Sequence, residues 1–136
     1  AVTANLRLGD VMPLLSSATG RCFAAHMPRE AVAPMLQDEL AHAAKLRRTD
    51  LPTTAAAVDT LLTEVRTHGS ARVVDTLLPG IVAFCAPVFD ADGHLVLGIT
   101  TLGSVATFDP NWGGAIDTPL RVAAAQLSQD LGAGCA

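Results

Sequence analysis

Four consecutive residues, Ser17-Ala18-Thr19-Gly20, have the side chains expected where the start of a helix binds an anion. The first N–H groups of a helix lack partners within it and carry a partial positive charge, which favours a carboxylate. Thr19 can add a hydroxyl hydrogen bond, and Gly20 allows a close approach to the backbone. Ser16 or Ser17 can equally form an ordinary helix cap without a ligand. Taken alone, the segment leaves both interpretations open.

Catalysis by a cysteine is the second kind of chemistry that the sequence could support. The three cysteines are widely spaced and lack a C-x-x-C motif, which favours a reducing cytoplasm. Cys85 precedes Ala-Pro in an apolar segment and has no histidine at a useful spacing, so we predict a small core residue rather than a nucleophile. A small cytosolic enzyme that uses Cys85 or Thr19 is an alternative, against which the absence of a base partner counts.

Neither a metal nor a cofactor is expected. No two of the four histidines have the i, i+4 or H-x-H spacing of a ligand pair. Asp90 and Asp92 flank a glycine turn, where carboxylates suit turn hydrogen bonds and do not form an acid/base pair.

Length and charge exclude further classes. The 136 residues fit one domain, residues 1–136. The net charge of −4 and the lack of a basic run argue against nucleic-acid binding by this chain itself. The longest apolar stretch, residues 81–89, is too short for a bilayer, and the first residues lack a secretory signal. We therefore expect a cytoplasmic protein without membrane contact.

The spacing of apolar residues, together with helix caps, glycines and prolines, predicts the helices and strands that position these side chains. The predicted elements are an extended opening over residues 5–15, a short helix from Ala18 that ends before Pro28, a helix from Pro34 to about Arg48, a helix capped by Thr53 or Thr54 and ended by Gly69, and a last helix with Pro119 at its first position.

Two segments rich in β-formers, Ile81–Phe89 and His94–Leu102, flank Asp90-Ala91-Asp92-Gly93 and predict a hairpin. Both are apolar with little alternation, so both faces of each strand are expected to be covered. The order of one strand, three helices, three strands and a helix predicts an α+β fold, with an antiparallel sheet flanked by helices.

Pairing Phe89 with His94 predicts the register, with Ala83 opposite Thr100 and Cys85 opposite Gly98. One face then carries mostly small residues: Ile81, Ala83, Cys85, Gly98, Thr100 and Leu102. The other is bulkier and is the expected core face: Phe84, Ala86, Val88, Leu95, Leu97 and Ile99. The small-residue face leaves room for a closely packed helix or a small ligand, and the residues alone favour the helix.

Three segments resemble the IclR family of bacterial transcriptional regulators. They are MPLLSSATGRCFAAHMP (12–28), VRTHGSARVVDTLLPGIVAFCAPVFDADGHLVLGITTLGS (65–104) and RVAAAQLSQDLG (121–132). The resemblance implies a GAF-like effector-binding domain that follows a winged helix-turn-helix domain. Neither that domain nor the opening strands and helices of the effector domain are found in this sequence, so we expect a partial effector-binding domain.

The resemblance also implies a ligand site. Members of the family hold a small organic acid between the strand-to-helix turn and the sheet, and the matching positions are Ala18, Thr19, Ala83, Thr100 and Leu102. Some members have cysteine or serine where this chain has Ala83 and Leu102. This departure favours a carboxylate with an apolar body.

We therefore predict a non-enzymatic small-molecule sensor that acts by population shift. Its expected partners are a small organic carboxylate, further copies of itself in a dimer or tetramer, and operator DNA only through the helix-turn-helix domain that this sequence lacks. A generic GAF-like signalling module is another alternative.

Overall fold

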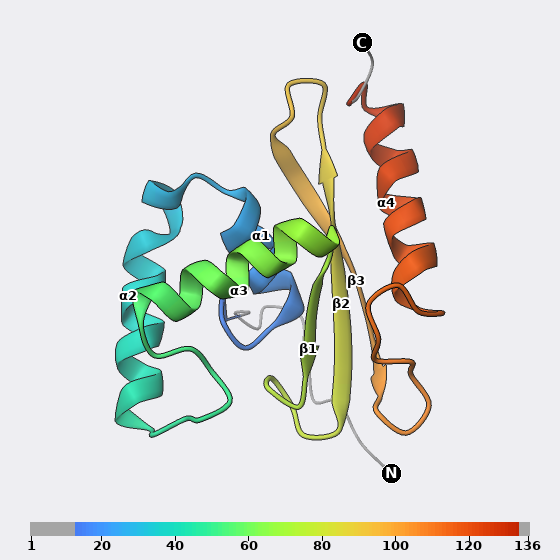
Figure 1. Ribbon diagram of the computed structural model, residues 1–136. Helices are drawn as coiled ribbons and strands as arrows, with labels where there is room; N and C mark the ends of the chain where they lie inside the picture. The colour runs from blue at the N-terminus through green and yellow to red at the C-terminus, as the bar shows by residue number, and fades with distance from the viewer. Residues whose placement is uncertain (1–12, 134–136) are drawn as a thin grey trace.

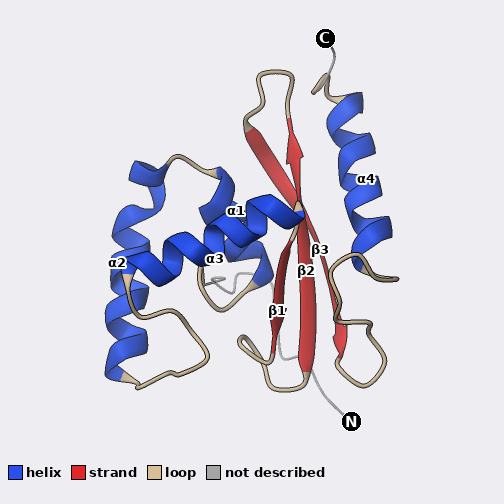
Figure 2. Cartoon of the chain, viewed as in Figure 1, coloured by secondary structure: helices blue, strands red, loops and turns tan. Residues whose placement is uncertain are grey.

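A three-stranded antiparallel sheet lies between three helices on one face and one helix on the other (Figure 1, Figure 2). This computed structural model describes residues 13–133. Its elements are α1 (Ala18–His26), α2 (Arg29–Lys45), α3 (Ala55–His68), β1 (Ala71–Val74), β2 (Ile81–Phe89), β3 (Leu95–Ser104) and α4 (Asp117–Asp130). The predicted α+β class is confirmed. The predicted opening strand lies outside the described residues except for residues 13–15, which begin the turn before α1.

The central strand, β2, separates two hydrophobic cores, and residues Ile81–Val88 are all buried. Ala83 and Cys85 belong to the core formed with α1, α2 and α3, whereas Phe84 and Val88 belong to the core formed with α4. Because successive side chains of a strand point to opposite faces, one apolar strand supplies both cores.

The predicted register is wrong by two residues, since Ala83 pairs with Leu102 and Cys85 with Thr100. One residue of the shift comes from the turn, where the N–H of Asp90 donates to the carbonyl of His94, and Phe89 therefore pairs with Leu95. The second comes from a bulge between this pair and the next, Val88 with Leu97. A slip of one residue exchanges the faces of a strand and a second slip restores them. The small-residue face therefore survives.

Two further strand predictions are wrong. Leu95, which precedes the bulge, lies beside His26 and Met27 at the end of α1 rather than with Leu97. The two faces of β3 are also not fully covered, because this strand is an edge of the described sheet and Val96 and Leu97 are exposed.

Helices α1 and α3 begin as predicted, at the caps Ser17 and Thr54, and Gly69 ends α3 at φ 80°. Helix α2 begins at Arg29, five residues before the predicted Pro34, because burial of Val32 and Leu36 offsets the hydrogen bond that the proline removes. Helix α4 begins at Asp117, so Pro119 takes its third position, where a missing N–H still costs nothing.

Candidate functional site

The side chains of Glu39 and Ser17 form hydrogen bonds with the backbone of the turn that leads into α1. The N–H groups of Leu14 and Leu15 donate to the Glu39 carboxylate at 2.7 and 2.9 Å. The buried Ser17 hydroxyl donates to the carbonyl of Pro13 at 2.6 Å and accepts from the N–H of Gly20 at 2.9 Å. Ser17 is thus the helix cap, and the start of α1 is rigidly placed.

Arg21 adds a positive charge next to this turn. Its guanidinium donates to the carbonyl of Leu15 at 2.7 Å and to that of Arg72 in β1 at 3.2 Å. Burial lowers the pKa of Arg21 to about 10, so it remains charged at neutral pH. The sequence does not signal the role of Glu39 or the bond from Arg21 to Arg72, because these partners lie 24 to 51 residues apart.

Gly20 has a different role from the one expected. A Cβ atom on Gly20 would lie 2.0 Å from the carbonyl oxygen of Pro13 and 2.6 Å from the Cα of Leu14. The space beside this glycine is therefore filled by the preceding turn, and the chain itself makes the close approach that was expected of a ligand.

The five predicted ligand-contacting residues gather where α1 starts above β2 and β3. The hydroxyl oxygens of Thr19 and Thr100 are 2.6 Å apart and form a hydrogen bond. Ala83 lies opposite Leu102 in the sheet, on the face that α1 covers. Ala18 and Ala83 are buried, Thr19 is half-buried, and Thr100 and Leu102 are exposed. The arrangement thus combines two hydroxyls that solvent can reach with a floor of small apolar side chains.

Within the described residues, two N–H donors in the first turn of α1 have no hydrogen-bond partner at this point. Its third N–H, of Gly20, is taken by Ser17. The N–H groups of Ala18 and Thr19 have no hydrogen-bond acceptor within residues 13–133. Unpaired N–H groups at a helix start, beside two hydroxyls, are the groups that bind a carboxylate.

Cys85 lies directly beneath the two threonines and is a fully buried core residue, as predicted. Hydrogen bonding with Cys22, and then with Thr100 and Thr19, lowers the pKa of Cys85, while the hydrogen bond with Cys85 and burial raise the pKa of Cys22. A Cβ atom on Gly98 would lie 2.6 Å from the sulfur of Cys85, so the thiol is enclosed on that side as well. This enclosure suits packing better than nucleophilic attack.

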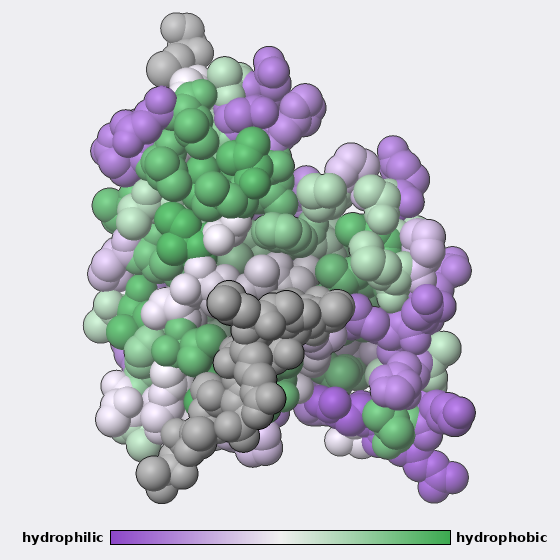
Figure 3. Space-filling view, turned by 180° about the vertical axis from the view of Figure 1, so that it is seen from behind, coloured by the Kyte–Doolittle hydropathy of each residue, from purple (hydrophilic) through white to green (hydrophobic). Residues whose placement is uncertain are grey.

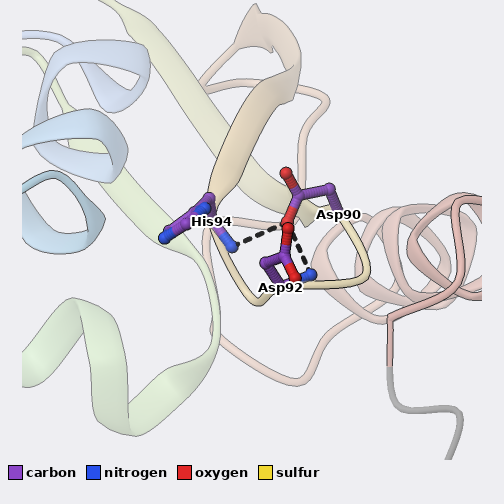
Figure 4. Close-up of side chains that lie close together, drawn as sticks. All are labelled: Asp90, Asp92 and His94. Atoms are coloured by element: carbon purple, nitrogen blue, oxygen red, sulfur yellow. Dashed lines mark hydrogen bonds between the residues drawn. The ribbon is translucent and has the colours of Figure 1, made fainter.

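Asp90, Asp92 and His94 form a second group of polar side chains, at the tip of the β2–β3 hairpin (Figure 4). Their potential ligand atoms lie within 4.8 Å of one another. One carboxylate oxygen of Asp90 accepts from the N–H groups of Asp92 and His94 at 2.9 and 3.0 Å. These bonds close the turn, which confirms the role predicted for the Asp90 carboxylate, whereas Asp92 contributes its backbone N–H.

Comparison of this chain with protein-family models gives a match to one family. The model described as bacterial transcriptional regulator IclR C-terminal matches residues 1–129. The crystal structure of HmgR from Pseudomonas aeruginosa is 33% identical with a TM-score of 0.84, and the match covers 100% of this chain and 52% of HmgR. The search of curated proteins finds no match.

Two other solved structures share the fold at lower identity. The regulator YaiJ is 24% identical with a TM-score of 0.75, over 97% of this chain and 72% of the YaiJ chain. The inducer-binding domain of an Acinetobacter PobR double mutant, solved with 3-hydroxybenzoic acid, is 15% identical with a TM-score of 0.69, over 96% of this chain and 74% of that one.

The chain spans about half the length of the first solved regulators that it resembles. Among the helices of residues 13–133, none has the length and apolar character needed to span a membrane.

Proposed function

This chain belongs to the family of bacterial transcriptional regulators that have an IclR C-terminal domain, and on that premise we propose that it is an effector-binding domain that senses a small organic carboxylate. The ligand would contact Ala18, Thr19, Ala83, Thr100 and Leu102. The family consists of transcriptional regulators rather than enzymes. The enclosed thiol of Cys85 gives the alternative of a cytosolic enzyme no support.

The hydrogen bond between Thr19 and Thr100 is the observation that carries this proposal. It joins the start of α1 to β3, an edge of the described sheet, across 81 residues of sequence. A carboxylate that accepts from both hydroxyls and from the N–H groups of Ala18 and Thr19 would replace this bond and change the spacing between helix and strand. Such a ligand favours one spacing over the other, which is a population shift.

The remaining parts of the regulator would convert this shift into DNA affinity. With a net charge of −4, this chain lacks the charge for phosphate contacts, so we assign operator DNA to a helix-turn-helix domain outside it. The PobR inducer-binding domain was solved with 3-hydroxybenzoic acid, so aromatic carboxylates are the first probes to use for the present chain.

Ligand binding is expected to depend on the Thr100 hydroxyl. A carboxylate at a hundredfold excess over its dissociation constant should stabilise the fold by about 3 kcal/mol, seen as a raised Tm. Thr100→Val keeps the shape and β-propensity but deletes a hydrogen-bonding group, so affinity should fall by about 1 to 2 kcal/mol. Thr19→Asp adds a negative charge to the site and should weaken binding further. Thermal shift titration with mono- and dicarboxylates measures both effects.

Thr101→Val is the matched control. Thr101 pairs with Phe84 and therefore faces away from α1, so the same chemical change should leave affinity unaltered. Melting shifts that persist unchanged in both Thr100→Val and Thr19→Asp would place the ligand elsewhere and end the proposal for this site.

We also propose that the chain self-associates through the exposed end of β3. The upper part of Figure 3, where the hairpin tip and the end of α4 lie, carries gathered hydrophobic side chains. Val96, Leu97 and Leu131 are among the exposed hydrophobic residues. Edge strands and apolar patches of this kind favour pairing with another chain.

Light scattering should therefore give a mass of at least two 14.0 kDa chains. Val96→Lys places a charge on the edge and should shift the mass towards one chain. Val122→Lys, on the first half of α4, is the control and should not. A single-chain mass for the unchanged protein at every concentration contradicts this proposal.

A further inference from the structure

A cleft of about 440 Å³ lies between the ends of α1 and α3, the last residues of β2, and α4. It exists because β1 begins only at Ala71, opposite Cys85, so that residues 86–89 of β2 have no strand beside them on that side within the described chain. Pro87 lies in this stretch, where its missing N–H leaves no strand partner unsatisfied. The floor is apolar and is formed by Ala86, Pro87, Phe89, Ala124 and Ala125.

The rim of the cleft is cationic. Arg66 and Arg121 line it, and none of the lining residues among those that the structure describes is acidic. Arg121 donates to the buried Asp117 at 3.0 Å, which offsets its charge. Arg66 donates to the carbonyl of Ala25 at 3.0 Å and to the Thr63 hydroxyl at 3.3 Å, and within residues 13–133 it makes no salt bridge. The charge of Arg66 is therefore available to a ligand.

The two arginines both lie near the end of α3. Arg66 lies in the last turn of α3, one turn before the cap Gly69. A Cβ atom on Gly69 would lie 3.6 Å from the Cδ of Arg121, so the Arg121 side chain runs across the end of that helix. The Arg121 side chain therefore lies at the junction of α3 and α4, whereas the Arg66 guanidinium lies between α3 and the end of α1, where it donates to Ala25.

His26 supplies an unsatisfied polar atom in the wall. Its Nε2 is buried and has no hydrogen-bond partner within the described residues, and its ring meets that of Phe89 edge-on at 5.2 Å. Burial, and then the charge of Arg66, lower the pKa of His26, so the imidazole is neutral at neutral pH. A buried polar atom without a partner costs stability, which a bound polar group would recover.

From the cleft, its apolar floor and the unpaired Arg66, we propose a second binding site, for a small organic anion with a flat apolar body. The carboxylate pairs with Arg66, and the body lies on Pro87 and Phe89. The volume is ample, since a cavity of about 150 Å³ already holds benzene. The apolar floor favours such a ligand over an inorganic ion.

This site is distinct from the one at Thr19 and Thr100 and does not rest on the proposed function. Ala86 and Ala124 belong to the core on the α4 face of the sheet, whereas Cys85, opposite Thr100, belongs to the core on the α1 face. The two sites can therefore be monitored separately in one titration.

Titration of the ¹⁵N-labelled 136-residue chain with benzoate, followed by NMR, tests the inference. The amide signals of Arg66, Gly69 and Gln129 should shift, with a dissociation constant on the order of 1 mM for so small a ligand. Benzamide, which keeps the ring but lacks the charge, should shift them far less. Arg66→Gln should weaken benzoate binding at least about fivefold, and Ala125→Trp should fill the cleft and abolish it. Lys45→Gln, which removes a positive charge from the end of α2, is the matched control and should change nothing.

The outcomes of this titration either support or overturn the second site. Shifts at the cleft signals that are lost in Arg66→Gln and Ala125→Trp but kept in Lys45→Gln support the second site. Equal shifts with benzamide, or shifts that Arg66→Gln leaves unchanged, overturn it. Shifts confined to Thr19 and Thr100 also overturn it while leaving the proposed function intact, whereas shifts confined to the cleft support the second site alone.

Discussion

Replacing Asp117 by alanine is expected to lower the free energy of unfolding by about 3 to 5 kcal/mol, because its buried carboxylate satisfies three donors and pairs with the half-buried Arg121. The Asp117 side chain is fully buried at the first position of α4. One of its oxygens accepts from the Ser70 hydroxyl at 2.5 Å, and the other accepts from the N–H of Gly113 at 2.8 Å and the guanidinium of Arg121 at 3.0 Å. Its loss leaves three donors without their acceptor and separates α4 from the start of β1.

Urea unfolding of the two proteins measures this difference. Asp59→Ala is the control, because Asp59 pairs with Arg29 at 2.8 Å on the surface, where such a pair contributes about 1 kcal/mol or less. Asp117→Asn keeps the shape and loses the charge, so its cost should fall between the two. If Asp117→Ala and Asp59→Ala were equally mild, the buried network would not be a main support of the fold.

Gly20→Ala is expected to cost about 3 kcal/mol, at the upper end for an overpacked site. The added methyl group would lie 2.0 Å from the carbonyl oxygen of Pro13, and this neighbour is backbone that the Glu39 carboxylate and Ser17 hold in place. Helix α1 must therefore move as a whole, which pulls Thr19 away from Thr100. Carboxylate affinity should fall together with stability.

The control separates steric conflict from backbone strain. Gly93 has φ 79°, but a methyl group there would have no atom within 4 Å, so Gly93→Ala should cost only the strain of about 1 to 2 kcal/mol. Thermal unfolding compares the two variants, and the thermal shift with a bound carboxylate compares their sites. A Gly20→Ala protein that melts and binds as the unchanged chain does would show that the turn before α1 is free to move.

The elements with strong local signals could be predicted from the sequence. Ser17 and Thr54 cap helices as expected, and Gly69 ends α3 in the left-handed conformation that glycine adopts without strain. Where local signals compete with burial they mislead. Pro34 suggests a helix start, yet the helix runs through it, because Val32 and Leu36 lie in the core.

The residues of the candidate site could be predicted from the sequence, but the contact that brings the helix and the sheet together could not. Ala83, Thr100 and Leu102 could be placed on a common face because alternation along a strand is a local property, and the turn and the bulge together shift the register by an even number of residues. Thr19 was predicted from the helix start and from the family resemblance. The hydrogen bond between Thr19 and Thr100 could not be predicted, because it depends on how far α1 reaches across the sheet. Glu39, Arg21 and the preceding turn determine that reach through contacts between distant residues.

The amino-acid sequence alone was enough to predict the α+β class, the hairpin of β2 and β3 and most of the helix ends, because caps, glycines and apolar spacing act over a few residues. The order and spacing of its motifs were enough to indicate the family. The folded chain was needed to show that Gly20 serves the turn rather than a ligand, that the buried Asp117 pairs with the half-buried Arg121, and that Arg66 lines an apolar cleft. Each of these depends on which side chain the fold brings next to a residue far away in the chain. The charge, burial and free space around a residue are properties of that neighbourhood, and local sequence does not encode them.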